Sequence, residues 1–300
     1  MAYPEMVRIV EVGARDGLQN ELSVSTDQKV ALIEALADAG LKNIEAGAFV
    51  SPKWVPQMAD SLEVITGLSV PSDVELSALT PNVKGAELAL QSGVKEFAIF
   101  TAASEAFTQK NINCSISESI ERFIPVMELA KANNIRVRGY VSCVVGCPYQ
   151  GEVRPEQVLD VCKQLLALGC YEVSLGDTIG VGTPNKVQKL LSLLLDNIPS
   201  DKLAVHFHDT YGQALANIHK ALEMGISVVD SAVAGLGGCP YAKGASGNVA
   251  TEDVVYLLEG LGIYTGIDLE RLARAGWQIC EALNKAPVSK VSLALKSQCA

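Results

Sequence analysis

The stretch Gly40-Leu41-Lys42-Asn43-Ile44-Glu45 joins the end of a helical pattern to the start of a strand pattern. Upstream of it, between Asp27 and Ala39, apolar residues recur at the three- and four-residue spacing of a helix. Its glycine can adopt the left-handed conformation that ends helices. The same junction recurs at Gly93, Gly169 and Gly225. The sequence therefore predicts a chain built from repeated helix-to-strand units.

Filling the intervals between these junctions gives eight predicted strands. They span residues 7–12, 42–47, 74–79, 94–101, 135–143, 171–176, 203–208 and 228–234. Helix-start signals lie between them, as a capping box at Ser25–Gln28 and as prolines at Pro155 and Pro184. Strict alternation predicts a parallel sheet, and eight units predict closure into a (β/α)₈ TIM barrel. An open doubly wound sheet is the alternative.

The length of 300 residues fits one barrel, and no linker separates two compositions. We expect a single catalytic domain over residues 1–300, with the barrel over 5–265 and a helical extension over 266–300. Within the extension, residues 268–283 have the pattern of an additional C-terminal helix. The chain is 49% hydrophobic but only 5% aromatic, so Ala, Val, Leu and Ile must fill the core, as in buried parallel sheets.

Charge and composition exclude several classes of protein. The net charge of −10 argues against a nucleic-acid partner, because the basic footprint is missing. We expect no membrane segment, since no apolar run reaches the length of about eighteen residues. We expect no signal peptide, since residues 1–13 have no basic region followed by a long apolar stretch. The eight cysteines form no CxxC pair, and we interpret them as reduced, mostly buried thiols of a cytoplasmic protein. Motifs for nucleotide hydrolysis, dinucleotide binding and serine hydrolysis are missing.

Polar residues gather where the predicted strands end. They are Arg15 and Asp16 after the first strand, Glu45 in the second, Asp177 at the end of the sixth, His206, His208 and Asp209 at the end of the seventh, and Cys239, Asn248 and Glu252 after the eighth. In a barrel these ends converge on one face, where barrel enzymes keep their active sites. Ionisable residues clustered there are costly to fold around unless they have a use.

His206 and His208 are the strongest local signal for a metal site. Side chains two apart on a strand point the same way, so both imidazoles can reach one ion, and Asp16 can meet them from the first strand. With the Asn248 amide oxygen as a further ligand, the set favours Mg²⁺ or Mn²⁺ over zinc. The alternative is a structural pair of histidines. His219 lies within the next predicted helix and is interpreted as an ordinary helix residue.

Two aspartates and an arginine surround this predicted metal site. Asp177 and Asp209 are candidates to hydrogen-bond the histidines, although for Asp209 we favour a helix cap. Arg15 places a permanent cation beside Asp16, where it can stabilise an oxyanion or bind a carboxylate. The alternative for Arg15 is a salt bridge at the barrel rim.

Cys239 lies in a segment, residues 235–247, that holds five glycines in thirteen residues. Such a segment packs poorly but can close over a ligand, so we predict that Cys239 is the most exposed thiol of the barrel mouth. An incidental loop cysteine is the alternative. Cys299, one residue from the end, is interpreted as a tail thiol, and Cys143 and Cys147 as packing residues.

The same positions carry a resemblance to a known family. Residues 11–21 resemble the opening motif of the 3-hydroxy-3-methylglutaryl-CoA (HMG-CoA) lyases, as do residues 48–58, 174–180 and 205–215. The Cys239 segment, up to residue 253, is similar to the family signature. The likeness covers roughly residues 5–285. Ala14 and Leu22 depart from it, because a proline and a basic residue are expected there in animal relatives. We therefore assign no CoA contact near Leu22.

The resemblance implies roles for the clustered residues. Asp16, His206, His208 and Asn248 would bind a divalent cation, Mg²⁺ or Mn²⁺. Arg15 would contact the substrate and, with Asp177 and His206, take part in catalysis. Cys239 would be the catalytic thiol, and Glu45 and Glu252 would support the site.

The implied reaction is the cleavage of HMG-CoA, an acyl-CoA, into acetyl-CoA and acetoacetate during leucine degradation, by a homodimer. Three alternatives are a related metal-dependent synthase or aldolase, an inactive metal-binding metabolite sensor, and a zinc hydrolase. The chain has no room for the regulatory domain that such synthases often carry.

Overall fold

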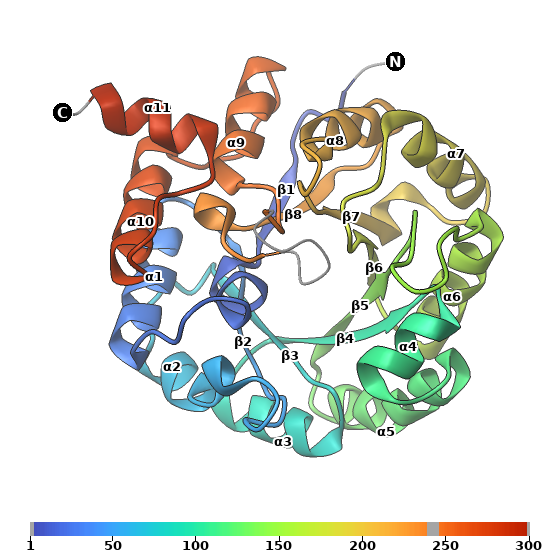
Figure 1. Ribbon diagram of the computed structural model, residues 1–300. Coiled ribbons are helices and arrows are strands. Elements are labelled where there is room, and N and C mark those ends of the chain that lie inside the picture. The colour runs from blue at the N-terminus through green and yellow to red at the C-terminus, as the bar shows by residue number, and fades with distance from the viewer. Residues whose placement is uncertain (1–2, 239–245, 299–300) are drawn as a thin grey trace.

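The structure is a computed structural model that describes residues 3–238 and 246–298. Within these residues, eight parallel strands close into a barrel in chain order, and β8 pairs with β1. Seen along the barrel axis, the strands occupy the centre and the helices surround them (Figure 1). The predicted (β/α)₈ barrel is confirmed, and the open sheet is wrong.

The eight predicted strands all occur, with ends shifted by a few residues. They are β1 (Arg8–Glu11), β2 (Asn43–Ala48), β3 (Glu75–Leu79), β4 (Glu96–Ala102), β5 (Arg136–Ser142), β6 (Glu172–Asp177), β7 (Leu203–Phe207) and β8 (Val228–Ser231). The helices around them are α1 (Thr26–Asp38), α2 (Ser61–Gly67), α3 (Val83–Ser92), α4 (Glu105–Ile112), α5 (Ile116–Ala132), α6 (Pro155–Leu168), α7 (Pro184–Leu195), α8 (Ala214–Glu223) and α9 (Thr251–Gly260).

The four junction glycines have the predicted left-handed conformation, with φ of 104° at Gly40, 86° at Gly93, 117° at Gly169 and 91° at Gly225. At Gly40 the packing is also too close for a side chain. A Cβ there would lie 2.3 Å from the carbonyl oxygen of Gly266. These glycines therefore let each helix end and turn directly into the next strand.

The helix starts and the buried cysteines of the structure also agree with the predictions from the sequence. Ser25 and Gln28 form the predicted capping box at the start of α1. The six cysteines among the described residues are buried and unpaired, as expected for reduced core thiols: Cys114, Cys143, Cys147, Cys162, Cys170 and Cys280. Within the described ranges, no helix is both long and apolar enough to cross a lipid bilayer.

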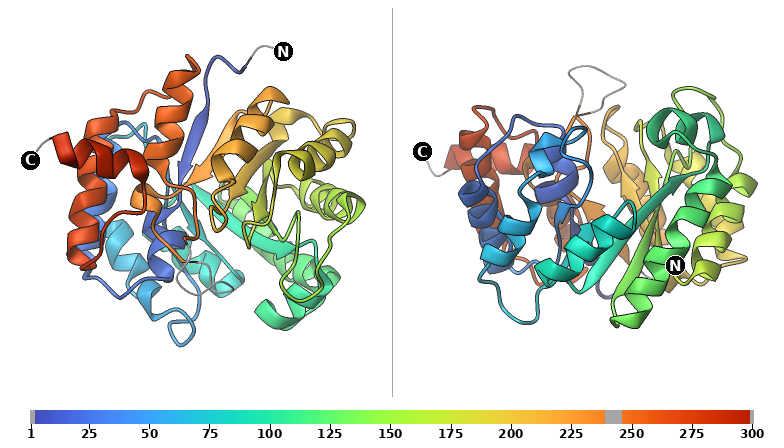
Figure 2. Two further views of the ribbon diagram at one scale, coloured as in Figure 1. Left: turned by 45° about the horizontal axis from the view of Figure 1, so that its top comes forward. Right: turned by 90° about the horizontal axis from the view of Figure 1, so that it is seen from below.

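The C-terminal region departs from the prediction in two places. The expected additional helix is α10 (Leu269–Ala282), but a further helix, α11 (Lys290–Gln298), follows it. Asp253 holds the start of α11 by accepting hydrogen bonds from Ser289 Oγ and the Val291 amide. Figures 1 and 2 show α10 beside α1 and α11 beside α9. The eighth strand is shorter than predicted because residues 233–235 form a tight turn.

Candidate active site

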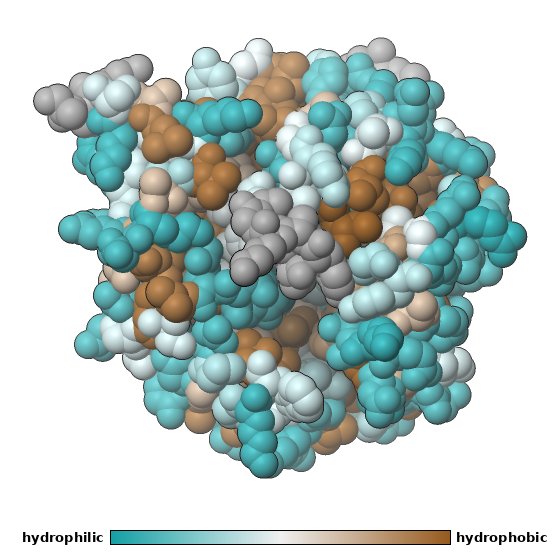
Figure 3. All heavy atoms as spheres, viewed as in Figure 1, coloured by the Kyte–Doolittle hydropathy of each residue, from teal (hydrophilic) through white to brown (hydrophobic). Residues whose placement is uncertain are grey.

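A cavity of about 880 Å³ opens at the carboxyl ends of the strands. Arg15, Asp16, His206 and His208 line its polar side, and Phe100, Phe107 and Phe123 are among its apolar lining residues. Figure 3 shows this face of the molecule, which is hollowed near its centre. Four of the polar residues that the sequence assigns to the strand ends therefore border a common cavity.

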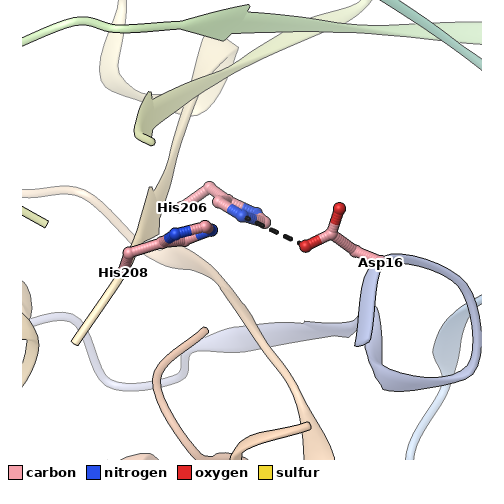
Figure 4. Close-up of side chains that lie close together, drawn as sticks. All are labelled: Asp16, His206 and His208. Carbon is pink, nitrogen blue, oxygen red and sulfur yellow. Dashed lines mark ion pairs between the residues drawn. The ribbon is translucent and has the colours of Figure 1, made fainter. Parts of the chain in front are cut away.

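Three of these side chains come together as a possible metal site. Asp16, His206 and His208 each offer one ligand atom, and the three atoms lie within 4.8 Å of one another. Figure 4 shows Asp16 facing both imidazole rings, with 4.0 Å between its Oδ2 and His206 Nε2. Among the described residues, His208 Nδ1 is buried without a hydrogen-bond partner. The donor set and the unpartnered nitrogen both fit a divalent cation.

Local structure explains why these residues meet. His206 lies in β7. His208 follows the strand, and its backbone forms an isolated antiparallel β-bridge with that of Asn248. Asp16 lies in a π-helical turn, Gly13–Gly17 (η1), in which the Gly17 amide donates to the Val12 carbonyl, five residues back. Such turns are frequent at functional sites. An added Cβ on Gly17 would lie 2.7 Å from Leu236 Cβ, so the turn packs tightly onto the segment after β8.

The charges around Asp16 keep it ionised. Burial alone would raise the pKa of this carboxyl, but Arg15, His206 and His208 lower it to about 2. Its Oδ1 accepts from Arg15 Nη1 at 2.7 Å and its Oδ2 from Asn248 Nδ2 at 2.8 Å. A carboxylate that stays charged near neutral pH can attract a cation.

The two histidines differ in their electrostatic environment. Burial, followed by the neighbouring His206, lowers the pKa of His208 to about 4, so its imidazole is neutral and can bind a metal. Burial would also lower the pKa of His206, but Asp230 raises it. The Asp230 carboxylate lies 3.3 Å from His206 Nδ1.

Arg15 is buried beside Asp16, with its Nη2 donating to Glu45 Oε2 at 2.9 Å. Burial alone would lower the pKa of its guanidinium, but Glu45 and Asp16 raise it. Among the described residues, its Nε is buried without an acceptor. Arg15 therefore combines a fixed positive charge at the cavity with a buried N–H that has no acceptor among the described residues.

Glu45 and Asn248 lie next to this group. Glu45 is fully buried and also accepts from the Tyr140 hydroxyl at 3.0 Å, so it holds Arg15 in place from below. The nitrogen end of the Asn248 amide faces Asp16. Metal binding through the Asn248 oxygen stays a prediction.

The two aspartates considered as histidine partners have other contacts. The Asp177 carboxylate accepts from the amides of Val181, at 3.1 Å, and Gly182, at 2.8 Å, and burial raises its pKa to about 6. It therefore holds the loop between β6 and α7. Asp209 Oδ1 accepts from the amide of Ala214, the first residue of α8, although the N-cap residue of this helix is Gln213. The carboxylate next to His206 is Asp230 instead.

Sequence reasoning missed three buried polar residues under the site: Arg138, Tyr140 and Asp230. Arg138 donates through both terminal nitrogens to Asp230, at 3.0 and 2.8 Å, and its Nη1 also donates to the Tyr140 hydroxyl at 2.9 Å. The sequence did contain a signal for two of them. Arg138 and Tyr140 lie two apart in a predicted buried strand, so their side chains point to the same face, which is the barrel interior.

Glu252 supports the site indirectly. Both of its oxygens accept from the Ala234 amide, at 3.0 and 2.8 Å, in the turn after β8 where Ala234 has a φ of 58°. Glu11 accepts from the Val233 amide in the same turn and from Gly13 at the start of η1. Burial raises the pKa of Glu252 to about 8 and that of Glu11 to about 7. These two acids therefore hold the backbone of η1 and of the turn after β8, on either side of the candidate metal site.

The raised pKa of Glu252 predicts a pH dependence of stability. In the unfolded chain the pKa is near 4.5, so between that pH and about 8 the folded state binds the extra proton. The contribution of Glu252 to the free energy of unfolding is thus fully present below pH 4.5 and is lost as pH rises toward 8. We expect the melting temperature of wild type to fall more than that of Glu252→Gln between pH 5 and pH 9. The scale is about 1.4 kcal/mol per tenfold change in proton affinity.

The control for this comparison is Glu63→Gln, at an exposed position in α2. It should keep the wild-type dependence on pH in the same calorimetric series. If the melting temperatures of wild type and Glu252→Gln fall in parallel with pH, the pKa of Glu252 is not raised in the folded protein.

Some predicted residues cannot be compared with the structure. Cys239 and Cys299 lie outside the described residues, so the catalytic thiol stays a prediction. His219 lies in α8, as expected, and its Nε2 is 2.7 Å from the Tyr3 hydroxyl.

A closed (β/α)₈ barrel with a carboxylate and two imidazoles gathered at the carboxyl ends of its strands is the arrangement of a metal-dependent barrel enzyme. Comparison with known proteins identifies the family. The HMGL-like family model matches residues 6–279, and the chain belongs to that family.

Curated relatives match over almost the whole chain. The mitochondrial hydroxymethylglutaryl-CoA lyase of Bos taurus is 59% identical over 97% of this chain and 90% of its own length. The 3-hydroxy-3-isohexenylglutaryl-CoA/hydroxymethylglutaryl-CoA lyase of Pseudomonas aeruginosa is 58% identical over 98% of this chain and 99% of its own length. The crystal structure of hydroxymethylglutaryl-CoA lyase from Pseudomonas aeruginosa matches with a TM-score of 0.98 and 58% identity, covering 99% of this chain and 100% of that one.

Proposed function

We propose that the chain is an HMG-CoA lyase that splits its acyl-CoA substrate into acetyl-CoA and acetoacetate. The observation that carries this proposal is the group Asp16, His206 and His208 beside Arg15, in a chain of the HMGL-like family. The names of the relatives support the same activity. Leucine degradation would be the metabolic setting.

The cation we propose is Mg²⁺ or Mn²⁺, held by Asp16, His206 and His208 with Asn248 as a further ligand. Carboxylate and amide oxygens favour these hard cations over zinc. When bound, the cation would lower the pKa of the substrate hydroxyl and so make it easier to deprotonate.

The chain's own groups would move the protons and stabilise the charge. A base beside the metal takes the hydroxyl proton, and the oxygen forms the ketone as the carbon–carbon bond breaks. An aspartate is favoured over His206 for this role, because His206 Nε2 faces the cation site and its Nδ1 faces Asp230. The bonding pair passes to the departing acetyl-CoA as an enolate, whose oxygen the Arg15 guanidinium stabilises. The contacts of Asp177 with Val181 and Gly182 favour a loop-holding role for it over that of the base. An acid, which we propose is Cys239, then protonates the enolate carbon.

Thiol alkylation should inactivate the enzyme through Cys239. A free thiol has a pKa near 8.5, so near neutral pH it still holds the proton that an acid must deliver. We expect Cys239→Ala to lower kcat, and bound substrate to protect wild type from an alkylating reagent. Cys299→Ala is the matched control and should remain sensitive. Loss of sensitivity in Cys299→Ala, with Cys239→Ala fully active, would refute the thiol-acid role.

We also propose a homodimer in the reducing cytoplasm. The six buried, unpaired cysteines support a reducing compartment, and the resemblance to the HMG-CoA lyases implies the dimer. Sedimentation velocity of the purified chain tests the dimer directly.

One assay separates the proposed activity from its alternatives. Purified protein is incubated with HMG-CoA and Mg²⁺, and acetoacetate, acetyl-CoA and free CoA are measured. Acetoacetate in equal amount to acetyl-CoA supports the lyase, and free CoA without acetoacetate supports a zinc hydrolase. Binding of the acyl-CoA without turnover would indicate a metabolite sensor. Turnover of another hydroxy acid or acyl-CoA, with none of HMG-CoA, would indicate a related synthase or aldolase.

A further inference from the structure

The interior of the barrel contains a charged layer directly beneath the candidate metal site. Arg138 and Glu172 are paired at 2.7 Å, and Asp230 pairs with the same arginine at 2.8 Å. All three side chains are about 1% exposed. Barrel interiors are normally filled by branched apolar residues, and burying charges costs several kcal/mol per ion. A charged layer at this depth is therefore expected to have a functional role that offsets its cost in stability.

Asp230 is held on every side by donors. Its Oδ1 accepts from Arg138 Nη2, and its Oδ2 accepts from Arg138 Nη1 at 3.0 Å and from Ser174 Oγ at 2.7 Å. The remaining neighbour of Oδ2 is His206 Nδ1, at 3.3 Å across the β7–β8 pair. A carboxylate paired with arginine is ionised and can only accept a hydrogen bond.

The consequence for His206 concerns which ring nitrogen carries the hydrogen. Because Asp230 can only accept, the Nδ1 that faces it must carry a hydrogen. In the neutral ring the lone pair then lies on Nε2, which faces Asp16 at 4.0 Å. His208 is held differently, since its Nδ1 has no partner among the described residues and its ring hydrogen-bonds to the Thr178 backbone.

The same arginine also connects to the other side of the site. A continuous set of buried contacts runs from His206 through Asp230, Arg138, Tyr140, Glu45 and Arg15 to Asp16. The members come from β7, β8, β5, β2 and η1. Arg138 is the residue at which the contacts of the metal-binding histidine and those of the substrate-facing arginine meet.

We propose that Arg138 and Asp230 are positioning residues that fix the His206 tautomer with its Nε2 lone pair toward the metal site. This inference rests on the proposed metal site. Neither residue touches the cavity side of the imidazole, so neither is a catalytic residue.

The first test reads the tautomer directly in the full-length chain before metal is added. The chain has only three histidines, so a ¹⁵N-histidine NMR spectrum can be assigned with His208→Gln and His219→Gln. At a pH where the ring is neutral, wild-type His206 should show a protonated Nδ1 and an unprotonated Nε2. Asp230→Asn removes the charge that holds this hydrogen and should give a mixture of tautomers. A wild-type His206 protonated at Nε2 would overturn the inference.

The second test measures Mn²⁺ affinity by electron paramagnetic resonance. Loss of a carboxylate partner typically costs 10–100-fold in metal affinity, so the dissociation constant of Asp230→Asn should rise by about that factor. Asp60→Asn is the matched control, because it makes the same change in another carboxylate that pairs with a buried cation, Lys29, on the barrel flank, away from the histidines. It should destabilise the fold and leave Mn²⁺ affinity unchanged.

The outcomes separate the inference from the proposal on which it rests. Failure of wild type to bind Mn²⁺ would refute the proposed metal site, and the NMR spectrum would still decide the tautomer. A folded Asp230→Asn protein with wild-type affinity and a wild-type spectrum would refute the positioning role alone. If Asp230→Asn does not fold, Ser174→Ala removes one hydrogen bond to the same oxygen without changing charge. It should weaken Mn²⁺ binding by a smaller factor, and unchanged binding would count against the inference.

Discussion

Replacing Asp16 by asparagine is expected to abolish metal-dependent turnover. Asp16 is the one carboxylate in the group of possible ligands, and its pKa of about 2 keeps it charged at any pH at which the enzyme would work. A bound divalent cation contributes several kcal/mol to charge stabilisation, and each 1.36 kcal/mol is tenfold in rate. We therefore expect Asp16→Asn to lower kcat at least about a hundredfold and to weaken Mn²⁺ binding in calorimetry. Chelation of wild type should have the same effect, reversed by Mg²⁺ or Mn²⁺.

The control for this experiment is a carboxylate with similar contacts but no histidine nearby. Asp60 accepts from Lys29 and from Thr26 on the flank of the barrel. Asp60→Asn should lower the melting temperature while leaving kcat and Mn²⁺ affinity close to wild type. Full activity of metal-stripped wild type, or of Asp16→Asn, would exclude a metal-dependent mechanism.

The fold was predictable because its signals are local. Each helix-to-strand junction places a glycine with positive φ next to a strand, so Gly40, Gly93, Gly169 and Gly225 mark the repeat without knowledge of tertiary contacts. The helix α11 was not predictable in this way. Its start depends on Asp253, which lies 36 residues from Ser289 in sequence, and no local pattern records that contact.

The candidate metal site, Asp16 with His206 and His208, was predictable for a different reason. His206 and His208 are two apart, and barrel topology brings Asp16 to the same end. The role of Asp230 was not predictable, because its partner Arg138 is 92 residues away and the register of two strands decides the contact. The contacts of Asp177 were not predictable either, and its catalytic role stays a prediction. Its position at a strand end resembles that of a catalytic residue, yet its carboxylate turns back to hold Val181 and Gly182.

Arg15→Met should separate a catalytic arginine from a rim salt bridge. Arg15 bonds to Asp16 and Glu45 through its two terminal nitrogens, so a purely structural role would predict lower stability and unchanged chemistry. Its place in the cavity lining favours contact with the substrate instead. Charge develops on the thioester oxygen only as the carbon–carbon bond breaks. A donor aimed at that oxygen is therefore felt in kcat more than in KM.

Loss of one oxyanion contact typically costs about 2.7–4 kcal/mol, so kcat of Arg15→Met should fall roughly 10²–10³-fold while KM changes much less. Arg15→Lys tests the geometry, because an ammonium keeps the charge but not the planar set of donors, and it should recover only part of the rate. Melting temperatures of both variants control for the loss of the Glu45 contact. If the melting temperature falls while kcat stays within twofold, Arg15 is a structural residue. If KM rises with kcat unchanged, Arg15 binds the ground state, and another group must stabilise the enolate.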